Sequence, residues 1–194
     1  MTTRAPTRDL LIEVGTNLIA EHGYNATGIN AVLKEAGVPK GCFYHYFSSK
    51  EAFGLAVIEA AAVDDEVSVQ ALLGDVRTVP LERLKAFFAA KRADMVACKH
   101  RRGCLIGNLG QEMSAHSDVL RDALDAIWQR RERQLAACLQ DGQHDGSIRR
   151  DMDAAALASF ILAGWQGALL RSKIVRDCTP LVDFECTLLA FLKP

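Results

Sequence analysis

The sequence predicts an all-α protein of about nine helices. Apolar residues recur at intervals of three and four along almost the whole chain, as on the buried face of an amphipathic helix. No segment alternates apolar and polar residues as a half-buried strand does, and glycine or proline stands where the periodic stretches end. With 194 residues, 49% of them hydrophobic and 24% charged, the chain is large enough to bury a globular core.

Four helices are predicted in the first 62 residues. The first apolar stripe is followed by Gly23, and the second ends at Gly37, where a left-handed cap is typical. Pro39 suits the first turn of the third helix, because its missing N–H needs no partner there. Ser48 and Ser49 suit the N-cap of the fourth. The predicted helices cover residues 7–21, 29–36 and 39–47, and the fourth is a long helix that runs from the serine cap through residue 62.

Five more helices are predicted beyond Gly74. They cover residues 81–98, 104–113, 119–139, 152–175 and 181–192, and Pro180 precedes the last. The segment 141–146, which contains two glycines and two aspartates, predicts a loop. We place a domain boundary after Phe47, so that residues 1–47 form a small amino-terminal domain and residues 48–194 form the larger one.

Composition excludes several classes of function. The net charge of −1 predicts no global attraction to nucleic acid, so any phosphate-binding patch has to be local. No apolar signal segment and no run of 18 apolar residues is present, which predicts a cytoplasmic protein with no membrane partner. None of the cysteines forms a C-x-x-C pair, so we expect free thiols, no metal and no cofactor. They are Cys42, Cys98, Cys104, Cys138, Cys178 and Cys186.

Residues 27–50 have the layout of a helix-turn-helix: a short helix, a glycine turn and a second helix that would enter the major groove of double-stranded DNA. Phe43 and Phe47, four residues apart, are expected to face inward. The candidate DNA contacts are Thr27, Lys40, Gly41, Tyr44, His45, Tyr46 and Lys50. Arg4 and Arg8 are candidates for an arm that reaches the backbone. The alternative is that the aromatic residues are only core and the lysines only solvated.

Cys104 follows a run of basic side chains. Residues 99–102 are Lys-His-Arg-Arg, and Cys104 itself is expected in the first turn of a helix. Positive charge and a helix N-terminus both favour thiolate over thiol, the condition for a nucleophilic cysteine. A small buried hydrophobic residue beside solvated arginines is an equally weighted alternative.

The helix predicted over 152–175 carries small residues three and four apart, including Ala156, Gly164 and Gly167. Small residues allow a second helix to approach closely, so this helix and the one over 181–192 suit a homodimer bundle. The alternative is an internal helix pair in a monomer.

The segment 39–51 resembles the helix-turn-helix signature of TetR-type transcriptional repressors, and the length and helix count fit over the whole chain. The resemblance implies a homodimer whose amino-terminal domain binds a palindromic operator and whose carboxy-terminal domain binds an inducer and forms the dimer. It also assigns DNA contacts to the candidates above. His45 and Tyr46 depart from the pattern, in which tyrosine and then histidine are common.

Residues 103–105, 107–112, 164–168 and 171–173 resemble one branch of that family, which includes the acrylate-responsive repressor and the repressor of N-ethylmaleimide reductase. This resemblance implies that Cys104 senses an electrophile or a short unsaturated acid, and that Lys173, with Arg171, lies near it. Lys173 is alternatively a rim charge. Trp165 is a candidate cavity residue or simply core, as are Phe88, Met95 and Trp128.

The expected function is therefore that of an inducer-released repressor. One rival is a repressor with a purely non-covalent hydrophobic ligand, for which Cys104 is structural. Another is a thiol-dependent enzyme. Against an enzyme, the sequence has no Ser-His-Asp order, no cluster with metal-ligand spacing and no glycine-rich phosphate loop.

Overall fold

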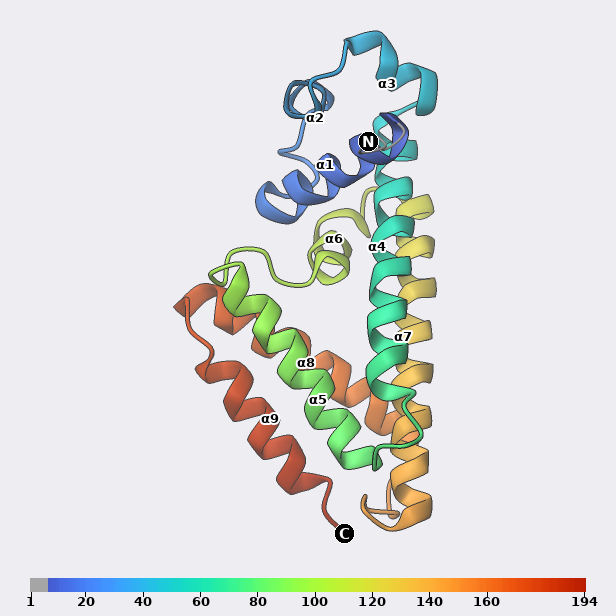
Figure 1. Cartoon of the computed structure of the whole chain (residues 1–194), viewed down its shortest axis with the longest axis vertical. Coiled ribbons are helices and arrows are strands. Elements are labelled where there is room, and N and C mark those ends of the chain that lie inside the picture. Colours follow the sequence, from blue (N-terminus) through green and yellow to red (C-terminus); the bar gives the residue numbers. More distant parts are fainter. Residues whose placement is uncertain (1–6) are drawn as a thin grey trace, which may run out of the picture. The chain divides into compact units, whose positions relative to one another are not determined.

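The computed structural model describes residues 7–194, so the arm predicted at Arg4 lies outside the described residues. Within this range the chain forms nine helices and no strand, which confirms the predicted fold class (Figure 1). The helices are α1 (Thr7–His22), α2 (Ile29–Ala36), α3 (Lys40–Tyr46), α4 (Lys50–Leu73), α5 (Pro80–Ala97), α6 (Leu105–Met113), α7 (Asp118–Asp145), α8 (Ala154–Val175) and α9 (Thr179–Phe191).

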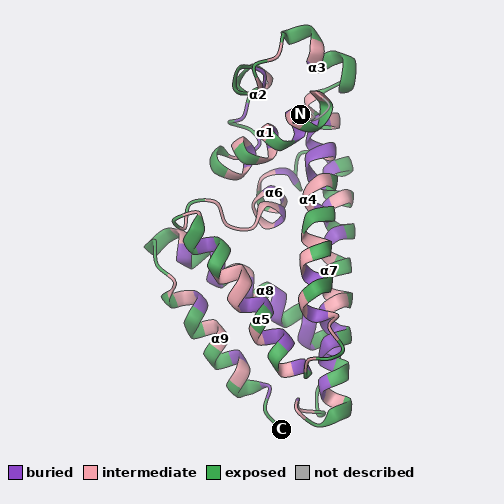
Figure 2. Cartoon of the chain, in the orientation of Figure 1, coloured by how far each residue is buried: buried purple, intermediate pink, exposed green. Residues whose placement is uncertain are grey.

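The helices divide into two compact units. Unit 1 contains the described residues up to Asp64 together with residues 104–126, and therefore α1–α3, the first part of α4, α6 and the start of α7. Its core is built from buried apolar side chains, among them Leu11, Val32, Phe43, Phe53 and Val57. In Figure 2 the first turns of α4 are largely buried, whereas α3 is largely exposed. The short helices of unit 1 are therefore held on one side only.

Unit 2 contains residues 65–103 and 127–194, and therefore the end of α4, α5, most of α7, α8 and α9. Helices α8 and α9 pack against each other, and Gly164 permits this approach, since an added Cβ there would lie 2.5 Å from Cε2 of Phe184. Trp165 stacks with Phe88 at 4.9 Å and with Phe184 at 5.8 Å between ring centroids. An aromatic cluster thus forms the centre of unit 2.

One predicted boundary is wrong. The loop predicted at 141–146 is helical up to Asp145, and the chain turns only at Gly146, which has φ of 82°. The helix continues because Gly142 leaves room for Ile148 to pack against it, and the Ile148 N–H donates to the Gly142 carbonyl at 2.9 Å. Helix α4, predicted as a long helix through residue 62, runs on to Leu73, and Val69 and Leu73 extend its buried stripe.

Helix α8 is long and apolar enough, by length and composition alone, to cross a membrane. However, 44% of its most apolar window is buried inside the protein, as is common for a core helix. Among the described residues, no group of three or more histidine, cysteine or acidic side chains is placed to hold a metal ion, and all six cysteines are free.

Candidate nucleic-acid interface and thiol site

The turn between α2 and α3 has the geometry that its sequence predicts. Gly37 caps α2 in the left-handed conformation, with φ of 66°, and the Val38 N–H donates to the Leu33 carbonyl at 3.1 Å. Glycine adopts this conformation without the strain a side chain would introduce. Pro39 is the N-cap of α3 rather than a residue of its first turn, and the helix begins at Lys40. The two helices are thus joined by a tight turn with a defined exit angle.

Two phenylalanines anchor α3. Phe43 and Phe47 are 0% and 3% exposed, and their ring centroids lie 5.3 Å apart. Both rings also contact Phe53 of α4, at 5.2 Å and 5.1 Å. A helix of seven residues is too short to be stable alone, so this aromatic contact determines its position. The inward orientation predicted for Phe43 and Phe47 is confirmed.

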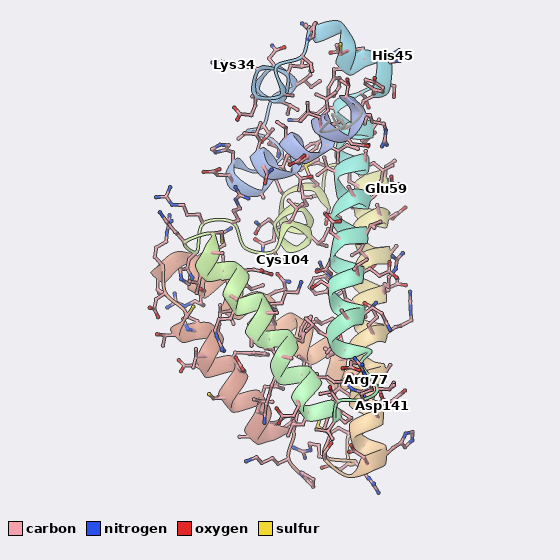
Figure 3. The ribbon with its side chains drawn as sticks, viewed as in Figure 1. Lys34, His45, Glu59, Arg77, Cys104 and Asp141 are labelled. Atoms are coloured by element: carbon pink, nitrogen blue, oxygen red, sulfur yellow. The ribbon has the colours of Figure 1, made fainter. Side chains whose placement is uncertain are left out.

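The opposite face of α3 is open to solvent. Tyr44 and Tyr46 are 56% and 39% exposed, and a Cβ added at Gly41 would meet nothing within 4 Å. Lys40 and His45 are exposed as well. Figure 3 shows His45 projecting from α3 and Lys34 projecting from α2. The face combines cationic groups, phenolic hydroxyls and close backbone access, which are the features a DNA-reading surface needs.

Two of the predicted DNA contacts have partners inside the protein. Thr27 is 4% exposed, and its hydroxyl donates to the Gly23 carbonyl at 2.7 Å. The Lys50 ammonium lies 4.6 Å from the centroid of the Tyr24 ring and 3.4 Å from the Asn25 carbonyl oxygen. Burial lowers the pKa of Lys50, while Glu112 acts in the opposite direction. Thr27 and Lys50 therefore support the turn between α1 and α2, and their DNA contacts stay predictions.

Glu112 of α6 holds this same turn. Its two carboxylate oxygens accept hydrogen bonds from the backbone N–H groups of Tyr24 and Asn25, at 2.8 Å and 2.6 Å. Such charge-assisted bonds are about twice as strong as neutral ones. Burial, followed by the charges of Glu51 and Glu112, raises the pKa of Tyr24 to about 12, so this phenol stays neutral. Sequence reasoning assigned Glu112 no role, because a surface glutamate on a short helix carries no signal of a partner 88 residues away.

Cys104 is the N-cap of α6, in agreement with the helix start predicted at this residue (Figure 3). Its sulfur accepts a hydrogen bond from the Gly107 N–H at 3.4 Å, and the residue is half-buried. A sulfur that accepts a backbone N–H at a helix N-terminus is favoured as thiolate. Cys104 is thus half-buried at a helix N-terminus, and its sensor role stays a prediction.

The other predicted sensor residues lie in unit 2. Trp165 is buried in the aromatic cluster, and Arg171 is exposed on α8. Lys173 is half-buried, and its stem runs past Gly103, since a Cβ added at Gly103 would lie 2.9 Å from Cδ of Lys173. Gly103 directly precedes Cys104 in the sequence and has φ of 76°, so a side chain there would be strained as well as crowded. Sensor roles for these three residues stay predictions.

Comparison with known families identifies both parts of the chain. The family described as bacterial regulatory proteins, tetR family, matches residues 11–57. The family described as tetracyclin repressor-like, C-terminal domain, matches residues 80–188.

Individual proteins are similar over almost the whole length. The transcriptional repressor DhaR of a Mycobacterium species is 39% identical over 98% of this chain and 94% of its own. The transcriptional regulator AcuR of Cereibacter sphaeroides is 42% identical over 91% of this chain and 81% of its own. The crystal structure of reduced Escherichia coli NemR superposes with a TM-score of 0.87 at 30% identity, covering 96% of this chain and 97% of that one.

Proposed function

The chain belongs to the TetR family and is a DNA-binding transcriptional repressor, and we propose that a small electrophile or short unsaturated acid releases it from its operator by acting at Cys104. Its operator and its inducer would both be met in the cytoplasm. The observation that carries the proposal concerns helix α6. Cys104 is its N-cap, and Glu112, in its last turn, accepts a hydrogen bond from the α1–α2 turn.

The outer face of α3 is the surface proposed to read the operator. Lys40 and the phenolic hydroxyls would bind phosphates, and Gly41 would admit the DNA backbone. Tyr44, His45 and Tyr46 have the exposure that contact with base edges or sugars needs. A homodimer would present two such helices about 34 to 36 Å apart, one turn of B-DNA.

An exposed apolar stripe on α8 supports that dimer. Phe160, Leu170 and Ile174 are large, apolar and exposed, and Gly167, between them, has nothing within 4 Å of an added Cβ. Contiguous exposed apolar surface of this kind marks an interaction site, and a small residue at its centre lets a second helix approach closely. On α9, Val182 and Phe191 add to the apolar surface.

The chemistry proposed at Cys104 is conjugate addition. The thiolate sulfur attacks the β-carbon of an electron-poor alkene, the π electrons move toward the carbonyl as an enolate, and solvent protonates the α-carbon. The adduct then occupies the N-cap position, so the sulfur no longer accepts the Gly107 N–H as a small thiolate does.

Helix α6 is the proposed path to the DNA-binding helices. Within unit 1, displacement of its first turn by an adduct would move Glu112 relative to the N–H groups of Tyr24 and Asn25. That turn connects α1 to α2, and α2 leads into α3. Released and operator-bound forms would thus differ in the position of the reading helices, as a two-state repressor requires.

The test is operator binding by the purified full-length protein. A fluorescent duplex from the DNA upstream of its own gene is titrated with and without acrylate or N-ethylmaleimide, using wild type, Cys104→Ser and, as a matched control, Cys186→Ser at an exposed cysteine. We expect release of wild type and Cys186→Ser but not of Cys104→Ser. Release of all three would contradict a mechanism that depends on Cys104.

A further inference from the structure

A second cysteine in unit 2 lies beside a histidine. The sulfur of Cys178 is 3.9 Å from Nε2 of His100, although the two residues are 78 positions apart. Both side chains are half-buried, so a small molecule can reach the sulfur. Cys178 is also the N-cap of α9, a helix of 13 residues. The pair is thus a nucleophile next to a potential base.

The orientation of His100 is determined by a buried hydroxyl. Ser172 is 0% exposed, and its hydroxyl donates to the Asp177 carbonyl at 2.6 Å. Because that hydroxyl has a single proton, its contact with Nδ1 of His100 at 2.8 Å has the ring nitrogen as donor. Nδ1 therefore carries the proton, and Nε2, which faces Cys178, has a free lone pair. This assignment makes Nε2 the acceptor for the thiol proton.

Two charged features lie beside the pair. A thiolate at Cys178 would lie at the positive end of the α9 dipole, and the imidazolium formed at His100 would lie next to it. The preceding Asp177 keeps its negative charge, because hydrogen bonds from the Thr179 hydroxyl and from the Thr179 N–H at 2.7 Å, together with the charge of His100, lower its pKa. The nucleophile, base and orienting hydroxyl have the relation found in cysteine nucleophiles of enzymes.

We propose that Cys178 is a second site of covalent modification, which takes small α,β-unsaturated carbonyl compounds with His100 as its base. Nε2 accepts the thiol proton, and the sulfur attacks the β-carbon, forming a C–S bond. The π electrons move onto the carbonyl as an enolate, and the imidazolium returns the proton to the α-carbon. The net reaction adds S–H across C=C, with no change of oxidation state and no leaving group.

This site uses a different cysteine from the proposed sensor. Its residues lie on the 98–103 loop, the end of α8 and the start of α9, all within unit 2, whereas Cys104 belongs to unit 1. An adduct on Cys178 would displace His100 from the sulfur and disturb the contacts that join the loop to the end of α8.

The experiment measures site-specific alkylation rates in the folded full-length protein carrying Cys104→Ser, so that the outcome is independent of the sensor proposal. The protein is treated with a limiting amount of N-ethylmaleimide, quenched with excess thiol at timed intervals and digested for peptide mass spectrometry. Cys186, exposed on the same helix, is the internal reference. The variants are His100→Gln, Ser172→Ala and the control His144→Gln, at an exposed histidine of α7.

We expect Cys178 to react about tenfold faster than Cys186. This is less than the roughly 10² to 10⁴-fold of general-base catalysis, because Cys178 is half-buried and Cys186 is exposed. His100→Gln should reduce this ratio at least fivefold, Ser172→Ala should reduce it less, and His144→Gln should leave it unchanged. Since the ratio is taken within one molecule, general loosening of the fold would raise the rates at both cysteines, and a thermal melt identifies such a variant. Equal rates at the two cysteines, or a ratio that His100→Gln does not alter, would overturn the proposal.

Discussion

Units 1 and 2 hold their helices by different means. In unit 1 the short helices depend on aromatic packing around Phe43 and on the hydrogen bonds that Glu112 accepts from a turn. In unit 2 the long helices are joined by ion pairs: Arg83 with Asp141 at 2.7 Å, and Asp65 with Lys91 and Arg131 at 2.8 Å and 2.7 Å. Arg92 of α5 also pairs with Glu185 of α9.

The difference shows where each unit can move. The attachment of the α1–α2 turn to α6 depends on two hydrogen bonds to one carboxylate, which a change within α6 can break. Unit 2 distributes its attachments over several charge pairs and an apolar core, so the loss of one leaves the rest in place. An inducible repressor needs DNA-binding helices whose position can change.

The largest effect is expected from removing the aromatic anchor of unit 1. Phe43→Ala should lower the free energy of unfolding by about 3 to 5 kcal/mol, because it leaves a cavity in a fully buried site. The neighbouring Tyr44→Ala, at an exposed position, should change it by about 0.5 kcal/mol or less while weakening operator binding. Urea unfolding followed by circular dichroism and DNA titration separate the two effects. Similar stability losses for both variants would contradict the assignment of inner and outer faces.

The next largest loss of stability is expected from removing a buried partner of a charge pair in unit 2. The side chain of Arg83 is 6% exposed, and it donates to the Thr78 carbonyl at 2.6 Å as well as to Asp141. Arg83→Met should therefore cost about 2 to 3 kcal/mol, since it leaves the buried Leu73 carbonyl and the part-buried Thr78 carbonyl without a donor.

Arg77→Ala is the control for this variant, because Arg77 pairs with Asp75 at the surface and should not measurably affect unfolding. Chemical denaturation of both variants provides the comparison. If Arg77→Ala is as destabilising as Arg83→Met, burial is not what distinguishes these two pairs.

A smaller stability effect, with a larger functional one, is expected at Glu112. Glu112→Gln retains the shape of the side chain, but its amide has only one acceptor oxygen. One of the two hydrogen bonds is therefore lost and the other loses its charge, which should cost about 1 to 2 kcal/mol. Because the freed turn leads into the DNA-binding helices, operator affinity should fall too. Gln111→Ala, at the exposed neighbouring position, is the control. Unchanged operator affinity in Glu112→Gln would argue against coupling through α6.

The smallest expected effect is a pH dependence in unit 2. Burial alone would raise the pKa of Asp65, but Arg131 and Lys91 outweigh it and hold the pKa below the ordinary value of 3.8. A carboxyl whose pKa is lower in the folded than in the unfolded state stabilises the folded protein at pH values above the unfolded-state pKa. This contribution is lost as the pH falls through the folded-state pKa.

Wild type should therefore lose stability below about pH 4, and Asp65→Asn should lose less over the same interval, because it lacks this titrating group. Urea midpoints measured from pH 6 down to pH 3 test this, and parallel curves for the two proteins would show that Asp65 does not contribute.

The sequence by itself determined the local features of this protein. The apolar period located nine helices within residues 7–194, and the spacing of Phe43 and Phe47 put both on the inner face of α3. Gly37 located the turn, and the residues before Cys104 located the start of α6. These features depend on residues within one or two helical turns of each other, so they can be inferred from periodicity, capping and backbone conformation alone.

Only the tertiary structure decided which distant groups meet. The bonds from Glu112 to the α1–α2 turn span more than 80 residues, and His100 meets Ser172 and Cys178 across more than 70. The helical extension through 141–145 likewise depends on Ile148 folding back onto Gly142. A side chain's own sequence neighbours carry no record of such partners, because the packing of whole helices determines which polar atoms come within hydrogen-bond distance.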